Sequence, residues 1–160
     1  MNKGRELAKT SCLFVALILT VALSALIITV AATNASFKVE PQQEHMITLS
    51  LQETDGVSGS FSVVSDDSSG INFFVIDPQN RTILGYLNTG QKKFSFTAEL
   101  TGDYQLQFDN SVSSVYTKTI ALNYDITHYI MGLPQEQFLL VVIAAVALLG
   151  LIIYIMLMPK

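Results

Sequence analysis

Hydrophobic and polar residues follow two different patterns along this chain. Two long uncharged apolar runs, 11–33 and 138–158, flank a middle segment in which apolar and polar residues alternate. A helix needs about 20 apolar residues to cross a hydrocarbon core of about 30 Å, and each run reaches that length. The pattern therefore predicts an N-terminal and a C-terminal transmembrane helix with a folded domain between them.

The middle segment alternates with a period of two residues, which is typical of strands that bury one face. The alternating stretches are 47–51, 60–63, 94–96, 104–108 and 119–124, and 71–76 is a nearly continuous apolar run. Turn-forming residues separate them, as at Asp55-Gly56, Asn88-Thr-Gly90 and Asp109-Asn-Ser111; such residues favour chain reversal. About eight short strands with frequent turns predict an all-β fold, an antiparallel jelly-roll-like β-sandwich.

Composition agrees with this division and excludes one class of partner. Only 14% of the residues are charged, against about a quarter in a typical soluble domain. The segment 36–136 carries twelve acidic and five basic residues, a net charge of −7. Because such a segment repels phosphate backbones, we do not expect nucleic-acid binding. The single cysteine, Cys12, lies in the first apolar run, so the middle segment has neither a disulfide nor a metal-thiolate site.

The positions of basic residues predict the orientation in the membrane. Lys3, Arg5 and Lys9 precede the first apolar run, and such flanks stay in the cytoplasm. That run is a signal peptide or a retained anchor, and its length favours the anchor. The predicted division is a cytoplasmic N-terminus (1–10), a transmembrane helix or signal peptide (11–33), an extracellular or lumenal β-sandwich (36–126), a juxtamembrane linker (127–137), a transmembrane helix (138–158) and a cytoplasmic C-terminus (159–160).

Small residues recur within both apolar runs. They are Ala16, Thr20 and Ser24 in the first run, and Ala144, Ala147 and Gly150 in the second. Small residues at three- or four-residue spacing let helices approach closely in lipid. We therefore interpret these six as helix-packing candidates, with the alternative that small residues are simply common in membrane helices.

A series of short motifs follows in a fixed order along the segment 71–126. They are Asp77-Pro-Gln-Asn80, Phe94-Ser-Phe-Thr-Ala98, Thr101-Gly-Asp-Tyr104, Phe108-Asp-Asn110 and Lys118-Thr119. In this order they resemble the Golgi-dynamics (GOLD) domain of the secretory cargo-receptor family. Secreted β-sandwich modules of bacterial proteases share the earlier motifs. The resemblance implies a lumenal or extracellular β-sandwich on a C-terminal membrane helix, used for binding other proteins.

Three departures from that family point to a divergent member of prokaryotic type. The domain has no cysteine for the usual disulfide, and the segment 127–137, interrupted by Gly132-Leu-Pro134, takes the place of a coiled-coil stalk. Pro159-Lys160 is too short to act as a coat-binding tail. These departures argue against coat-coupled sorting and favour a module held close to its membrane.

Two sequons are candidate modification sites. Asn80-Arg-Thr82 and Asn34-Ala-Ser36 fit the N-glycosylation pattern on the exported side. Asn80 falls in a predicted turn, which makes it accessible, whereas Asn34 follows the first apolar run closely.

We expect neither a metal centre nor a cofactor. His45 and His128 lie near opposite ends of the domain sequence and lack further ligands in spacing. Asp66-Asp67, with Glu53 and Asp55 nearby in sequence, could clamp Ca²⁺, but the alternative of a solvated acidic loop is favoured because the ligand spacing of a calcium loop is missing. No nucleophile or phosphate-binding motif occurs, which argues against an enzyme.

Two further features receive structural interpretations. Tyr104 alternates with Leu106 and Phe108 and is expected to point into the core. Lys92-Lys93 is expected to protect a sheet edge from pairing.

The sequence favours a membrane-anchored extracytoplasmic module for protein–protein interaction. Its expected partners are the lipid bilayer and a protein, with the role of a trafficking-type adaptor or an accessory subunit of a membrane complex. The alternative is a module for an extracellular small ligand, a carbohydrate or a lipid headgroup, since jelly rolls often bind such ligands. The absence of tryptophan makes carbohydrate the weaker choice.

Overall fold

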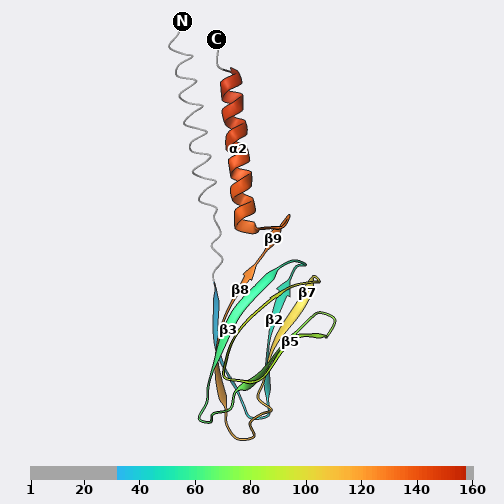
Figure 1. The fold of residues 1–160 in the computed structure, drawn as a ribbon, viewed down its shortest axis with the longest axis vertical. Coiled ribbons are helices and arrows are strands. Elements are labelled where there is room, and N and C mark those ends of the chain that lie inside the picture. Colours follow the sequence, from blue (N-terminus) through green and yellow to red (C-terminus); the bar gives the residue numbers. More distant parts are fainter. Residues whose placement is uncertain (1–31, 158–160) are drawn as a thin grey trace. The chain divides into compact units, whose positions relative to one another are not determined.

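The computed structural model describes residues 32–157, which form ten strands and one helix (Figure 1). These are β1 (Thr33–Val39), β2 (Glu44–Leu51), β3 (Gly56–Val64), β4 (Ile71–Ile76), β5 (Thr82–Thr89), β6 (Gln91–Thr97), β7 (Gly102–Asp109), β8 (Lys118–Thr127), β9 (Tyr129–Ile130), β10 (Leu133–Pro134) and α2 (Gln135–Leu157). The predicted all-β sandwich is confirmed.

The eight longer strands form two antiparallel sheets. One sheet has the order β1-β8-β3-β6 and the other the order β2-β7-β4-β5. Apart from the β4–β5 hairpin, each strand is followed by a strand of the opposite sheet. Eight strands in two sheets with such crossings constitute a jelly roll. The short strands β9 and β10 pair only with each other among the described residues.

Alternating residues of both sheets fill the space between them. Three rings form the centre: Phe61 of β3 lies 5.0 Å from Phe73 of β4 and 5.4 Å from Phe108 of β7, measured between ring centroids. Aromatic pairs at such distances add to the stabilisation from burying apolar surface. The buried apolar residues are Val39, Leu49, Leu51, Val57, Phe61, Ile71, Phe73, Val75, Phe94, Ala98, Tyr104, Leu106, Phe108, Ile120 and Leu122. Tyr104 points inward, as predicted.

The sandwich has two distinct ends. At the entry end, β1 begins at Thr33, β8 ends at Thr127, and the turns 52–55, 77–81 and 98–101 lie between strands. At the distal end lie the loops 40–43, 65–70 and 110–117 (the bottom of the sandwich in Figure 1). The pairing of Val39 with Lys118, and of Thr33 with Tyr124, fixes these positions.

The helix α2 lies outside the compact unit of the sandwich, which ends at Tyr129. It has 23 residues, and those after Gln137 are uncharged. Within residues 32–157, no helix meets the length and apolarity required of a membrane span, so the predicted membrane helices gain no support from the structure. The run 11–33, with Ala16, Thr20 and Ser24, lies outside the described residues. Ala144, Ala147 and Gly150 are exposed on α2.

Candidate functional site

Seven of the eighteen residues that carry the motif resemblance are buried inside the sandwich. Tyr104, Phe108, Asn110 and Lys118 are each at most 1% exposed, and Asp77 is 5% exposed. A residue that solvent cannot reach does not contact a partner. These motif residues therefore hold the fold together, and a binding surface has to be sought among the residues that they position.

Asn110 connects two loops at the distal end. The two protons of its side-chain Nδ2 are shared among the carbonyl oxygens of Val39 (3.1 Å), Glu40 (3.2 Å) and Tyr116 (3.0 Å), so one of these hydrogen bonds is bifurcated. Its backbone N–H donates to the carbonyl of Gln43 at 2.9 Å. Because buried carbonyls are costly when unpaired, this single amide fixes loop 110–117 against loop 40–43.

Lys118 anchors the third distal loop. Its side chain is fully buried, and Nζ donates to Asp67 Oδ1 at 3.0 Å, to the Ser69 carbonyl at 2.9 Å and to Ser69 Oγ at 2.6 Å. All three protons of the ammonium group therefore have an acceptor, as a buried charge requires. The contacts fix loop 65–70 against the first residue of β8.

The Asp67 carboxylate accepts hydrogen bonds from Ser65, Ser69 and Lys118 within this anchor. Hydrogen bonds from the hydroxyls of Ser65 and Ser69, followed by the contact with Lys118, hold the pKa of the Asp67 carboxyl far below its usual range. Asp55 precedes β3 whereas Asp66 and Asp67 follow it, so a nine-residue strand separates them. The calcium cluster considered from the sequence is therefore not assembled. Across residues 32–157, no group of three His, Cys, Asp or Glu residues is placed to hold a metal.

The anchored loop 110–117 presents apolar side chains to solvent. Val112, Val115 and Tyr116 are 39%, 71% and 44% exposed, and we call these three residues the distal apolar surface. Ser113 Oγ accepts a hydrogen bond from the Tyr116 N–H at 2.9 Å, which shapes the loop from within. Loops held by a rigid scaffold commonly carry binding residues, and clustered exposed apolar groups mark interaction sites.

The entry end is closed by short turns. Asp77 Oδ1 accepts from the N–H groups of Gln79 (2.9 Å) and Arg81 (2.8 Å), and Asp77 Oδ2 from Arg81 Nε (2.6 Å). Burial would raise the pKa of Asp77, but the hydrogen bonds and charge of Arg81 outweigh burial and lower it. The Tyr104 hydroxyl contacts the Leu100 N–H and carbonyl, both at 3.2 Å.

The two histidines lie at opposite ends of the sandwich. His45, near the start of β2, stacks on Phe37 with ring centroids 4.2 Å apart. His128, after β8, contacts Asp55 through Nδ1 at 2.9 Å. The structure therefore gives each its own partner and does not bring them together as metal ligands.

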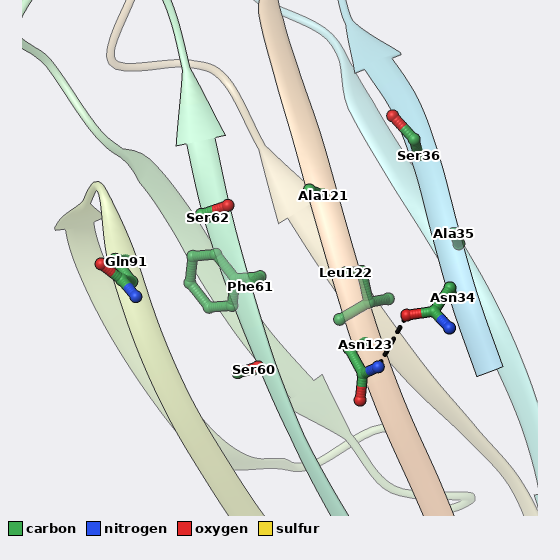
Figure 2. A pocket seen from close by; sticks show the side chains of 10 residues that line it. All are labelled: Asn34, Ala35, Ser36, Ser60, Phe61, Ser62, Gln91, Ala121, Leu122 and Asn123. Atoms are coloured by element: carbon green, nitrogen blue, oxygen red, sulfur yellow. Dashed lines mark hydrogen bonds between the residues drawn. The ribbon is translucent and has the colours of Figure 1, made fainter. Parts of the chain in front are cut away.

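A second surface feature is a shallow hollow on the outer face of the β1-β8-β3-β6 sheet (Figure 2). Its volume is about 460 Å³. The lining residues are Asn34, Ala35, Ser36, Ser60, Phe61, Ser62, Gln91, Ala121, Leu122 and Asn123. None is charged, and Figure 2 shows the Asn123 amide donating to Asn34 Oδ1, at 2.6 Å. Hydroxyls and amides beside apolar residues such as Ala121 and Leu122 are suited to a neutral, hydrogen-bonding ligand.

The two sequons occupy different environments. Asn80 is exposed in the turn 77–81 with φ of 65°, so its side chain is open to solvent. Asn34 is exposed on β1, but its Oδ1 is already engaged by Asn123. Geometry therefore favours Asn80 as the accessible acceptor.

The distal apolar surface was not identified from the sequence. Residues 110–117 alternate in neither the strand nor the helix period, and their serines and asparagine are typical of an ordinary loop. The pair Val115-Tyr116 could have indicated a surface here, because large apolar residues are uncommon in a loop of this kind. Its exposure, however, depends on the anchors at Asn110 and Lys118.

Comparison with solved structures finds weak likenesses. The crystal structure of PliG from Aeromonas hydrophila, a periplasmic inhibitor of g-type lysozyme, is 16% identical with a TM-score of 0.46, over 61% of this chain and 87% of that chain. The Yersinia pseudotuberculosis-derived mitogen is 13% identical with a TM-score of 0.45, over 61% and 86%. The SPBc2 prophage-derived protein YomS is 12% identical with a TM-score of 0.37, over 63% and 99%.

Comparison with curated protein sequences gives no match. A family model described as emp24/gp25L/p24 family/GOLD matches residues 34–137, which is more than half of the chain. The matched range contains every motif from Asp77 to Lys118 that carries the resemblance in the sequence. The predicted GOLD domain is confirmed, and the chain belongs to the emp24/gp25L/p24 (GOLD) family.

Proposed function

We propose that this chain is a membrane-anchored extracytoplasmic module that binds a protein partner through the distal apolar surface. The observation that carries the proposal is the exposure of Val112, Val115 and Tyr116 on a loop that buried Asn110 holds in place. Family membership supports protein binding, because GOLD domains of cargo-receptor type are protein-binding modules. The role is that of a trafficking-type adaptor or an accessory subunit of a membrane complex.

The energetics favour this surface as a contact site. Burying a large apolar side chain against a partner contributes about 1.5–3 kcal/mol. A loop that is already ordered loses little conformational freedom on binding, so more of that free energy remains as affinity. Valine and tyrosine also have few rotamers to lose, which makes them efficient contact residues.

A cross-linking experiment tests the binding surface. A photo-reactive amino acid replaces Val115 in the full chain, and intact membranes of the native host are irradiated. We expect one dominant protein adduct that disappears when Tyr116→Ser is added. The matched control places the same probe at Met46, which is 43% exposed on β2. Adducts of equal pattern from both positions, or lipid adducts alone, would contradict the proposal.

The proposed anchoring rests on the sequence. The run 138–158 is uncharged and long enough to span a bilayer, and basic residues precede the run 11–33. This arrangement leaves both termini in the cytoplasm if the first run is retained, with the sandwich on the opposite side. We expect the protein to remain in the membrane fraction after alkaline carbonate extraction, and release into the supernatant would argue against anchoring.

Thiol labelling tests the orientation. In a Cys12→Ser background, single cysteines are introduced at Ser95, which is exposed on β6, and at Lys160. A membrane-impermeant maleimide is expected to label Ser95→Cys in intact cells and Lys160→Cys only after lysis. The reverse order of labelling would contradict an extracytoplasmic sandwich.

A second candidate function is the binding of a neutral polar ligand, a carbohydrate or a lipid headgroup, in the hollow of Figure 2. Its uncharged hydroxyl and amide lining favours this alternative. Glycan arrays and vesicles of defined headgroup composition would identify a ligand. Ala121→Leu, which fills the floor of the hollow, should abolish that binding, whereas Val115→Ser should leave it unchanged.

Glycosylation of Asn80 is a separate proposal. In a host with an N-glycosylation pathway, we expect glycosidase treatment to lower the mass of the protein, and Asn80→Gln to remove this shift. No mass change on glycosidase treatment of the native protein would contradict it.

A further inference from the structure

The short strands β9 and β10 form a hairpin directly before the helix α2. No residue of this hairpin, 129–134, is charged, and its turn is Met131-Gly132. Met131 at the tip is 88% exposed, and Ile130 and Leu133, which flank the turn, are each 37% exposed. The tip of the hairpin is therefore apolar, and the methionine side chain is left open to its surroundings.

Met131 is an unusual residue for its position in the turn. Its φ is 53° and that of Gly132 is 79°, and positive φ at both central residues is typical of a type I′ hairpin turn. Asparagine, aspartate and glycine are favoured at the first of these positions, because a bulky side chain is strained at positive φ. Asparagine or aspartate would also suit exposure to water. The turn itself gives no reason for methionine, which points to an apolar environment for the tip.

The length of α2 places the hairpin relative to a bilayer. The part of α2 from Phe138 to Leu157 is about 30 Å long at 1.5 Å per residue, which is the thickness of a hydrocarbon core. A bilayer that contains this part of α2 has its core boundary at Phe138. Gln135, the first residue of α2, is then about 5 Å from the core along the helix axis, and the headgroup layer of one leaflet is about 5–8 Å thick. Since β10 ends at Pro134, the hairpin starts within that layer.

The charges around the hairpin indicate which lipids it suits. Lysine and arginine, which attract anionic headgroups, are absent from the sequence 119–159. The nearest acidic residues in sequence are Asp125 and Glu136, and Glu136 lies in the first turn of α2, where the helix dipole favours a carboxylate. An apolar tip next to acidic residues is suited to uncharged or zwitterionic lipids and not to an anionic surface.

We propose that the tip of the β9–β10 hairpin, Ile130, Met131 and Leu133, inserts into the headgroup layer of the bilayer as a second membrane contact beside α2. This inference rests on the membrane anchoring proposed above. The occupant is lipid because the uncharged hairpin joins the apolar helix without an intervening residue. Apolar side chains bind at this depth through the area that they bury, and side chains at the interface set the tilt of a membrane helix.

Tryptophan fluorescence measures the depth of the tip, because the chain has no tryptophan of its own. Met131→Trp, Val146→Trp and Val115→Trp are made singly in the full chain and reconstituted in phosphatidylcholine vesicles with bromine at defined acyl positions. Val146, exposed on α2, reports the anchor, and Val115, exposed on the distal apolar surface, is the matched control. We expect shallow bromine to lower the Met131→Trp emission about twofold. Deep bromine should quench Val146→Trp most, and neither should affect Val115→Trp.

A second probe keeps the turn residues unchanged. Leu133→Trp repeats the measurement at a residue without positive φ. Adding Met131→Asn creates Asn-Gly, the preferred sequence of a type I′ turn, so the hairpin is kept while its apolar tip is lost. We expect shallow quenching of the Leu133→Trp emission to fall by about half, with no decrease in melting temperature. Unchanged quenching would show that Met131 does not hold the tip in lipid and would overturn the proposal.

The outcomes separate this contact from the anchoring on which it rests. If Val146→Trp is quenched while Met131→Trp and Leu133→Trp behave like Val115→Trp, α2 is anchored and the hairpin contact is wrong. If none of the four is quenched, the anchoring is wrong and the contact fails with it. A photo-reactive amino acid at Met131 should give lipid adducts in native membranes. A dominant protein adduct would show that a protein covers the tip and would overturn the proposal.

Discussion

The two ends of the sandwich are fastened in different ways. At the entry end, two buried side chains act over four residues: Asp77 accepts from the Arg81 N–H, and Tyr104 of β7 contacts Leu100 in the preceding turn. At the distal end, Asn110 reaches Val39 across 71 residues and Lys118 reaches Ser69 across 49. Local anchors shape single turns, whereas long-range anchors assemble several loops into one surface.

The difference bears on where a partner can bind. The entry end also has long-range contacts. The Thr54 N–H donates to the Ala98 carbonyl and the Ala98 N–H to the Asp55 carbonyl, both at 2.8 Å, so backbone bonds join two of its turns. The side-chain contact of Asp55 with His128 involves a ring that is 49% exposed. At the distal end both anchors are fully buried, so the loops they hold are fixed relative to one another. A composite surface fixed in this way can present Val115 and Tyr116 in one geometry, which is the requirement for specific recognition.

The largest expected effect comes from removing the buried charge at the distal end. Lys118→Met keeps the volume of the side chain but leaves the Ser69 carbonyl and Asp67 without their cation. Breaking a fully buried ion pair costs about 3–5 kcal/mol, and the lower end of that range applies here because the Asp67 side chain is 22% exposed. We expect the free energy of unfolding of the full chain in detergent to fall by about 3 kcal/mol, followed by circular dichroism. Lys93→Met on the exposed edge strand should change it by less than about 0.5 kcal/mol. Equal effects would refute the assigned burial.

Removing the amide of Asn110 should have the next largest effect. Asn110→Ala leaves three carbonyl oxygens without their donor, and buried unsatisfied groups cost about 1–3 kcal/mol each before relaxation. We expect a loss of about 2 kcal/mol in unfolding free energy. Hydrogen exchange should also become faster in both 40–43 and 111–117. Faster exchange in only one of these loops would show that the amide does not connect them.

A local anchor at the entry end should matter less. Tyr104→Phe removes one hydroxyl and its contacts with Leu100 while keeping the ring in the core. A neutral hydrogen bond contributes about 1 kcal/mol, so we expect a loss of about 1 kcal/mol. Faster hydrogen exchange should be confined to 98–103. Tyr116→Phe, at an exposed ring, is the control and should be neutral. Faster exchange at the distal loops in Tyr104→Phe would contradict the local role.

The smallest expected difference between the two ends is in how the free energy of unfolding depends on pH. The pKa of Asp67 at the distal end and that of Asp77 at the entry end are both lowered. A carboxyl with a lowered folded-state pKa contributes stability above its unfolded pKa, near 4, and loses it as pH falls below that value. We expect the unfolding free energy to decline below about pH 4. Asp67→Asn should flatten this decline more than Asp77→Asn, because the Asp67 pKa is lowered further. The opposite ranking in pH titrations of stability would contradict the assignment.

Strand positions were largely predictable from the sequence, with two informative exceptions. The stretches 47–51, 71–76 and 104–108 fall within β2, β4 and β7. The strands β1 and β5 were not identified. In β5 the adjacent pairs Ile83-Leu84 and Tyr86-Leu87 break the alternation because both faces of that edge carry apolar side chains. The pattern fails at an edge strand whose register against β4 is itself irregular.

The sequence by itself determined the β class, the GOLD family and the inward direction of residues such as Tyr104. Alternation is a local property, because the side-chain period of a strand is two residues. Only the tertiary structure decided which strands pair, which edges stay open and what Asn110 and Lys118 hold. These depend on contacts between residues far apart in the chain, which no local pattern encodes. Burial then assigned motif residues such as Asn110 and Lys118 to the scaffold of the domain.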